Sequence, residues 1–202
     1  MKIICLPVTV MQENVYFYYD DETKSGVVID PGGESNRLCQ FITERGLKIE
    51  GILLTHSHFD HVLAVHALKE ATSAPIVCHT DEAAMLRSVQ LGYAGNIEAD
   101  LLLNDNDVFT FDGHKIQLIH TPGHTPGGAS YYAEESAALF SGDTLFYDSV
   151  GRTDFPGGDH DALRSSIRDK LFALPDDTAV YPGHGESTSI GYEKLNNPFV
   201  RF

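Results

Sequence analysis

Residues 55 to 61 read Thr55-His56-Ser57-His58-Phe59-Asp60-His61. Alternate side chains of an extended segment point to the same side, so His56, His58 and Asp60 can converge on one point. His61 follows at the start of an expected helix and can face the same point from the first turn. Imidazole and carboxylate groups together are ligands for zinc, manganese or iron. The segment therefore predicts a metal site.

Outside this segment, three more stretches combine a short apolar strand with a glycine-containing loop that holds one ionisable residue. They are Ile119-His120-Thr121-Pro122-Gly123-His124, Leu139-Phe140-Ser141-Gly142-Asp143 and Val180-Tyr181-Pro182-Gly183-His184-Gly185. Glycine lets the backbone bend sharply and approach an ion closely. Loops at strand ends are where layered α/β proteins hold functional groups. These loops add His124, Asp143 and His184 to the candidate ligands.

Seven candidate ligands are more than one catalytic zinc needs, since that ion takes three protein ligands and leaves one position open. Two ions that share a carboxylate account for all seven. We expect the first ion on His56, His58 and His124. We expect the second ion on Asp60, His61 and His184, with Asp143 between both. Two ions roughly 3.5–4 Å apart would lower the pKa of water and hold a bridging hydroxide as nucleophile.

The remainder of the chain predicts layered sheets covered by helices, because short strands and helices follow one another along it. A helix is expected at 35–45, where Leu38 and Ile42 keep helical spacing and Gly46 can end it. A second is expected after Asp159, which can cap it. A third is expected directly after the histidine segment, with its buried side made of Val62, Leu63, Val65 and Leu68. With 202 residues and no linker-like stretch, we expect one domain over 1–202.

The composition excludes several classes of partner. The formal net charge is −15, which repels nucleic acid and anionic membrane surfaces. No apolar stretch approaches the roughly 20 residues that span a bilayer, and the N-terminus does not read as a secretory signal. The three cysteines show no CxxC pairing, so we expect a cytoplasmic protein.

Taken together, the motifs resemble the metallo-β-lactamase fold superfamily, and within it the glyoxalase II-like (hydroxyacylglutathione hydrolase-like) branch of single-domain bacterial type. The resemblance covers the chain from about residue 28 to its end and rests on residues 55–61, 121–128, 141–146, 151–158 and 182–185. It implies an α/β protein, a four-layer αββα sandwich with a binuclear site along one edge. It also implies two divalent metal ions per chain, with zinc expected first and iron or manganese as alternatives.

The implied activity is hydrolysis of a small-molecule thioester, such as S-lactoylglutathione, by a metal-bridging hydroxide, with Asp60 and Asp143 in catalytic roles. Longer glyoxalase II enzymes continue into a helical domain that helps to hold glutathione. We expect no such domain here, so glutathione specificity does not carry over. Tyr147 and Arg152 are candidates for substrate contact, although we favour a structural pairing of Arg152 with Asp154.

Other activities of the same scaffold stay open. One is a mononuclear iron dioxygenase acting on glutathione persulfide, with His56, His124 and Asp143 as its iron ligands. Another is a lactonase. A β-lactamase is less favoured, because Asp143 stands where those enzymes lack an aspartate. A metal-stabilised scaffold without catalysis is disfavoured because no ligand is missing.

Overall fold

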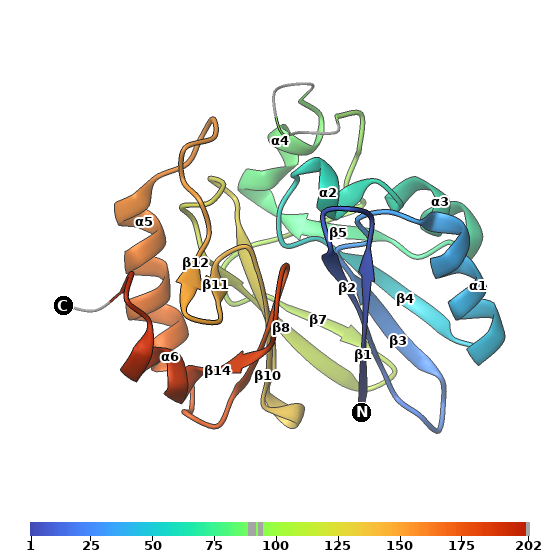
Figure 1. Cartoon of the computed structure of the whole chain (residues 1–202). Coiled ribbons are helices and arrows are strands. Elements are labelled where there is room, and N and C mark those ends of the chain that lie inside the picture. The colour runs from blue at the N-terminus through green and yellow to red at the C-terminus, as the bar shows by residue number, and fades with distance from the viewer. Residues whose placement is uncertain (89–91, 93–94, 201–202) are drawn as a thin grey trace.

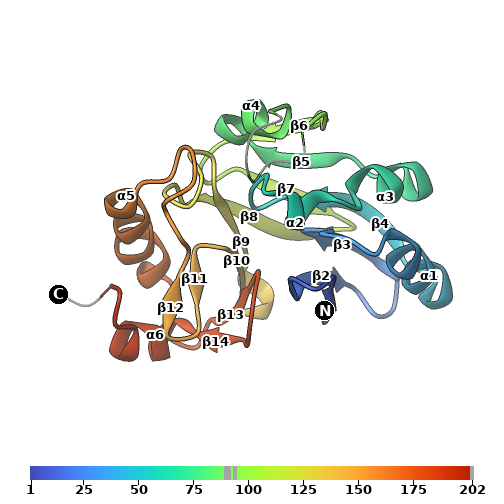
Figure 2. The same cartoon turned by 45° about the horizontal axis from the view of Figure 1, so that its top comes forward.

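Two six-stranded sheets face each other in the computed structural model, which describes residues 1–88, 92 and 95–200. Helices cover the outer face of each sheet (Figures 1 and 2). The layers therefore run helix, sheet, sheet, helix, and the predicted four-layer αββα sandwich is confirmed.

The first sheet is built from the N-terminal half of the chain. Its strands, in spatial order, are β1 (Lys2–Val8), β2 (Glu13–Tyr19), β3 (Ser25–Ile29), β4 (Lys48–Leu53), β5 (Ile76–His79) and β6 (Leu101–Leu103). β1, β2 and β3 pair antiparallel, whereas β3 to β6 are parallel. The helices on its outer side are α1 (Ser35–Arg45), α2 (Phe59–Val62), α3 (Val65–Thr72) and α4 (Ala83–Leu86), preceded by a single 3-10 turn, η1 (Thr80–Glu82).

The second sheet is built from the C-terminal half. Its strands, in spatial order, are β14 (Thr188–Ser189), β13 (Ala179–Pro182), β10 (Ala138–Gly142), β9 (Ala129–Ala133), β8 (His114–His120) and β7 (Val108–Phe111). β10 and β13 are parallel and the other pairs antiparallel. Its outer face is covered by α5 (His160–Ser165), which continues through a π-helical and a 3-10 segment to Ala173, and by α6 (Ile190–Asn196). A small hairpin of β11 (Leu145–Phe146) and β12 (Ser149–Val150) follows β10.

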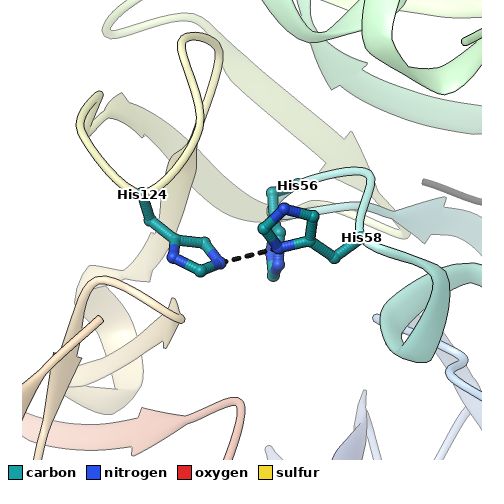
Figure 3. A group of neighbouring side chains, drawn as sticks. All are labelled: His56, His58 and His124. Atoms are coloured by element: carbon teal, nitrogen blue, oxygen red, sulfur yellow. Dashed lines mark hydrogen bonds between the residues drawn. The ribbon is translucent and has the colours of Figure 1, made fainter. Parts of the chain in front are cut away.

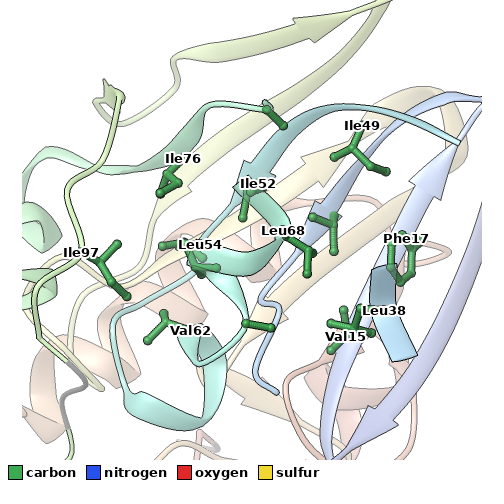
Figure 4. Close-up of a cluster of buried hydrophobic side chains, with 14 of the residues drawn as sticks. Val15, Phe17, Leu38, Ile49, Ile52, Leu54, Val62, Leu68, Ile76 and Ile97 are labelled. Atoms are coloured by element: carbon green, nitrogen blue, oxygen red, sulfur yellow. The ribbon is translucent and has the colours of Figure 1, made fainter. Parts of the chain in front are cut away.

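Three apolar clusters join these layers. Val15 and Phe17 of β2 pack with Leu38 of α1 and Leu68 of α3 on the outer face of the first sheet (Figure 4). The alternate residues of β2, Tyr16 and Tyr18, point the other way into the cluster between the sheets. A β-strand places successive side chains on opposite faces, so β2 is buried on both. The third cluster packs α5 and α6 on the second sheet.

The helices at 35–45 and after Asp159 are confirmed. Gly46 ends α1 in the left-handed region at φ 63°, and the Asp159 side chain accepts a hydrogen bond from the Ala162 backbone. The single helix expected after the histidine segment is wrong. The Ala64 N–H donates to the Pro31 carbonyl instead of continuing the helix, which separates α2 from α3. Leu63 at this break is 57% exposed and not buried as expected.

The carboxyl ends of four strands meet at one edge of the sandwich. β4 in the first sheet and β8, β10 and β13 in the second all end there, followed by the loops that carry the predicted ligands. Among the described residues, no helix has the length and apolar character needed to cross a membrane.

Candidate metal centre

All seven predicted ligands lie together at this edge. His56 and His58 follow β4, while Asp60 and His61 belong to α2. His124 lies in the loop between β8 and β9, Asp143 directly follows β10, and His184 follows β13. The structure therefore draws the seven side chains from both sheets.

His56, His58 and His124 form one tight group (Figure 3). Their ring centroids are 4.5 to 4.8 Å apart. His124 Nε2 lies 2.8 Å from His58 Nδ1. All three residues are at most 4% exposed.

Asp60, His61 and His184 form a second group beside the first. His184 Nε2 lies 3.3 Å from Asp60 Oδ2. Asp143 faces both groups: its Oδ1 is 3.4 Å from His61 Nε2, and its Oδ2 is 3.7 Å from His124 Nε2. The seven side chains thus lie in the two sets expected from the sequence, with one carboxylate between them, and Asp30, His56 and His61 form a further close group.

Outward hydrogen bonds fix which ring nitrogen of His61 and His124 carries a proton. His61 Nδ1 lies 3.0 Å from Asp30 Oδ2, and His124 Nδ1 lies 2.7 Å from the Arg152 carbonyl oxygen. Because both oxygens only accept, each Nδ1 must be the donor. In a neutral ring the Nε2 lone pair is then free to bind an ion, as in metal sites whose histidines are oriented by their other nitrogen.

A hydroxyl relay orients His56 in the same way. Thr55 Oγ1 donates to Asp30 Oδ2 at 2.5 Å, so its oxygen can accept from His56 Nδ1 at 3.0 Å. Asp30 also accepts from the Thr55 backbone N–H at 2.7 Å. One buried carboxylate thus orients two histidines, and the Nε2 atoms of His56 and His61 point inward.

Three buried atoms at the centre fit bound metal. His56 Nε2, His61 Nε2 and Asp143 Oδ1 have no hydrogen-bond partner among the described residues. An unsatisfied buried polar atom costs roughly 1–3 kcal/mol, which coordination of a cation would remove. The surrounding set of nitrogen and oxygen donors suits zinc, iron or manganese and not a soft ion such as copper(I).

The electrostatics keep the first group neutral. Burial and neighbouring imidazoles lower the pKa of His58 to about 3 and hold the pKa of His56 well below its usual range. Burial also acts to lower the pKa of His61, but the carboxylates of Asp143 and Asp30 outweigh it and raise that pKa. Burial acts to raise the pKa of Asp143, yet His61 and the other imidazoles hold it well below its usual range. The carboxylate between the two groups is therefore ionised.

The sequence model of the Metallo-beta-lactamase superfamily matches residues 8–184, which include all seven side chains. The chain belongs to this superfamily. Its His/Asp clusters are typical of the dinuclear sites of metallo-beta-lactamase proteins.

Three relatives match nearly the whole chain. Hydroxyacylglutathione hydrolase GloC of Haemophilus influenzae is 41% identical over 99% of this chain and 98% of that protein. The crystal structure of BLEG-1 B3 metallo-beta-lactamase has a TM-score of 0.93, with 38% identity over 100% of both chains. TTHA1623 in a di-iron-bound form has a TM-score of 0.86 and 37% identity, covering 97% of this chain and 99% of the other. The chain is thus a metallo-hydrolase related to hydroxyacylglutathione hydrolase.

A cavity of about 200 Å³ opens beside the metallo-beta-lactamase-type site. Its lining consists of Met11, His58, Phe59, Asp60, Gly92, His124, Asp143, Arg152, Phe155 and His184. Arg152 Nε and Nη2 donate to Asp154 at 2.7 and 2.8 Å, so the favoured pairing of Arg152 is confirmed. Among the residues that the structure describes, Tyr147 is not one of those that line this cavity. It stacks on Tyr192, with ring centroids 5.1 Å apart.

A further cluster of ligand-type residues, His79, Asp81 and His120, lies outside this site. The rings of His79 and His120 stack with centroids 3.8 Å apart and an interplanar angle of 10°. Imidazole lone pairs lie in the ring plane, so those of stacked rings run parallel and do not converge on an ion. His120 Nε2 also contacts the Pro126 carbonyl oxygen at 3.0 Å. This pair is therefore a packing contact.

Sequence reasoning did not single out three contributors to the site. Asp30 had one visible signal, since it directly follows the apolar strand β3 and precedes Pro31-Gly32-Gly33, much as the candidate ligands follow their strands. Thr55 is the first residue of the histidine segment but is not itself a ligand type. The partner of His124 is the backbone oxygen of Arg152, which no side-chain pattern can reveal.

Gly183 sits where the site has no room for a side chain. A Cβ atom there would come within 2.4 Å of Asp143 Oδ1 and 2.6 Å of His61 Cε1. We expect Gly183→Ala to displace these groups and to weaken metal binding at least about 10-fold, the effect of disturbing groups that orient ligands. Zinc affinity measured against a competing chelator checks this result. Gly46→Ala is the control, because its Cβ would meet open space where α1 ends, away from the ligands, so the strain at φ +63° should lower stability without changing zinc affinity; equal losses of zinc affinity in both variants would contradict the steric explanation.

Proposed function

We propose that this chain is a thioesterase of glyoxalase II type that hydrolyses S-lactoylglutathione or a related acyl thioester. The observation that carries the proposal is the 41% identity to a hydroxyacylglutathione hydrolase over nearly the full length of both chains. We also propose that residues 1–202 act as a single hydrolase domain. A reducing cytoplasm fits, since all three cysteines are free thiols.

In this proposal His56, His58 and His124 hold one divalent ion, and Asp60, His61 and His184 hold the other. Asp143 is their shared ligand. Zinc is expected first, and iron is the main alternative because a related structure is di-iron-bound. Bound at these residues, the two ions would lower the pKa of a water molecule and polarise the substrate carbonyl.

The protein's own groups complete the catalytic arrangement. Asp60 lines the cavity beside His184. Burial acts to raise the pKa of Asp60, but the hydrogen bond with His184 and the charge of His61 lower it. Its carboxylate is therefore ionised at neutral pH, the form in which it could hold the second ion. Asp30 and the Arg152 carbonyl hold the histidine rings in the orientation that the ligands need.

The mouth of the cavity is suited to a small substrate. Met11, Phe59 and Phe155 are the large apolar residues of its lining, beside the ionisable residues of the site. The Arg152 guanidinium lies 4.0 Å from the centre of the Phe155 ring, paired with Asp154. With a net charge of −15 on the chain, this mouth favours a compact thioester over a nucleic acid.

β-Lactam hydrolysis is the second candidate function. It is favoured by the 38% identity and TM-score of 0.93 to BLEG-1 B3 metallo-beta-lactamase over the whole of both chains. A β-lactam also presents a carbonyl to the same cavity. The two activities differ in the bond that is broken, an amide in place of a thioester.

The test is a side-by-side assay of zinc-loaded and iron-loaded protein. S-lactoylglutathione, a chromogenic β-lactam and glutathione persulfide are offered separately, with oxygen uptake followed for the last. We expect the thioester to give the highest kcat/KM and the chelated protein to give none. Faster β-lactam turnover would establish the second candidate instead. Iron-dependent oxygen uptake without thioester cleavage would contradict both.

A further inference from the structure

Glu82 is a buried carboxylate that the proposed chemistry does not use. It ends the 3-10 turn η1 and is 0% exposed. Such a group is rarely buried without partners, since desolvation of its charge is costly. The partners of Glu82 belong to two of the loops that carry ligands.

Each oxygen of Glu82 serves one of these loops. Oε1 accepts from the Ser57 backbone N–H at 2.8 Å and from the Ser57 hydroxyl. Oε2 accepts from the Thr125 hydroxyl at 2.9 Å and from the Gly127 N–H at 3.0 Å. An ionised carboxylate offers about four acceptor positions, which these four donors fill.

The residues bound by Glu82 are the neighbours of proposed ligands. Ser57 stands between His56 and His58, and Thr125 follows His124. Gly127 lies so close to η1 that a Cβ atom would be 2.1 Å from the Glu82 nitrogen. The His124 loop is therefore packed against the turn that carries the carboxylate, with no space to shift toward it.

We propose that Glu82 is a positioning residue for one of the two metal positions. It joins the loop of His56 and His58 to the loop of His124, and so holds these three imidazoles together before an ion binds. The inference rests on the ligand set proposed above, and it does not depend on which substrate is hydrolysed.

The second metal position has contacts that do not involve Glu82. Asp30 binds His61 Nδ1, and Asn14 Nδ2 donates to the Pro182 and Gly185 carbonyl oxygens on either side of His184, both at 3.0 Å. Within the part of the chain that the structure describes, the Glu82 side chain makes no hydrogen bond to His61 or to the loop of His184. Loss of Glu82 should therefore weaken zinc binding at the position of His56, His58 and His124 and leave zinc binding at the other position unchanged.

Glu82→Gln is the test, with zinc titrated into the whole protein against a competing chelator. The Gln amide can turn only one acceptor oxygen toward the two loops, and its NH₂ group must face the backbone N–H of either Ser57 or Gly127. We expect two classes of zinc site in the wild type. In the variant, the class that is also lost in His124→Ala should weaken roughly 10- to 100-fold, the range for groups that orient metal ligands, and the other should change less than about 3-fold.

Glu193→Gln is the matched control. Glu193 is also 0% exposed and accepts from the Asp148 N–H, the Thr188 hydroxyl and the Asn197 amide, none of which adjoins a proposed ligand. Its replacement should lower Tm without changing either zinc affinity. Equal weakening of both zinc classes in Glu82→Gln, or the same weakening in Glu193→Gln, would overturn the inference.

Thr125→Val covers the case in which Glu82→Gln does not fold. It removes one donor and keeps the carboxylate, so the same zinc class should weaken by a smaller factor. Unchanged affinity for both ions in a folded Thr125→Val would also overturn the inference. A wild-type protein that binds no zinc, iron or manganese would instead refute the proposed ligand set before any variant is compared.

Discussion

Asp143→Ala is expected to reduce hydrolysis at least about 100-fold, since even the loss of groups that only orient metal ligands costs up to that factor. Asp143 is the carboxylate that faces His61 at 3.4 Å and His124 at 3.7 Å, so it lies between the two groups. Without it, at least one ion should be held more loosely. The measurements are kcat/KM on the best thioester and the metal content of protein purified without chelator.

The control for this variant is Asp21→Ala. Asp21 is an exposed carboxylate in the turn between β2 and β3, paired with Lys2 and Lys24. It should leave both activity and metal content unchanged. Near-normal turnover and metal content in Asp143→Ala would contradict a bridging role.

Asp30→Ala is expected to lower the free energy of unfolding by about 3–5 kcal/mol, the typical cost of removing one partner from a buried ionic contact. Asp30 is 2% exposed and accepts from Thr55 and His61. Its removal leaves buried donors unpaired. Denaturant unfolding of chelated protein checks this result without a contribution from bound metal.

Asp30→Asn separates two causes of that loss. Asp30 has φ 48°, a left-handed conformation that Asn tolerates better than Ala. Asn also keeps one acceptor oxygen, so a smaller loss is expected than for Ala. If Asp30→Ala lost less than about 1 kcal/mol, the role assigned to this carboxylate would be wrong.

The sequence predicted the candidate ligands because they occur in a local pattern. Each lies in a segment that follows a short apolar strand, and the alternation of apolar residues predicts where those strands end. The four layers followed from the same pattern. The metal-binding roles themselves remain predictions, to be tested by the variants above.

The groups that orient the ligands could not be predicted in this way. Glu82 and Asn14 act through hydrogen bonds to residues far away in the chain, and a lone acidic or amide residue carries no periodic signal. Asp30 has a position in the sequence like that of the candidate ligands, but its partners are also distant. The break at Leu63 has a similar origin, because the Ala64 N–H finds its partner at Pro31. Long-range hydrogen bonds are set by the finished fold and not by local preference.

Tyr147 and Arg152, the two residues predicted to contact substrate, also show how little a position in the sequence says about the cavity. Both stand close to Asp143 in the chain, but only Arg152 belongs to the cavity lining, and Tyr147 is held by Tyr192 of α6. Sequence distance from a candidate ligand is thus a weak guide to which side chains line the cavity, and contact of either residue with a substrate stays a prediction.

The origin of the ligands in both sheets also bears on biosynthesis. His56 to His61 emerge from the ribosome early, whereas Asp143 and His184 follow much later. A nascent chain that has folded its first sheet therefore has an incomplete set of the proposed donors. Competing cellular chelators could then remove an ion that it had bound. If the ions bind as proposed, both sets of donors are complete only once His184 has been translated, so stable metal loading would follow synthesis of this part of the chain.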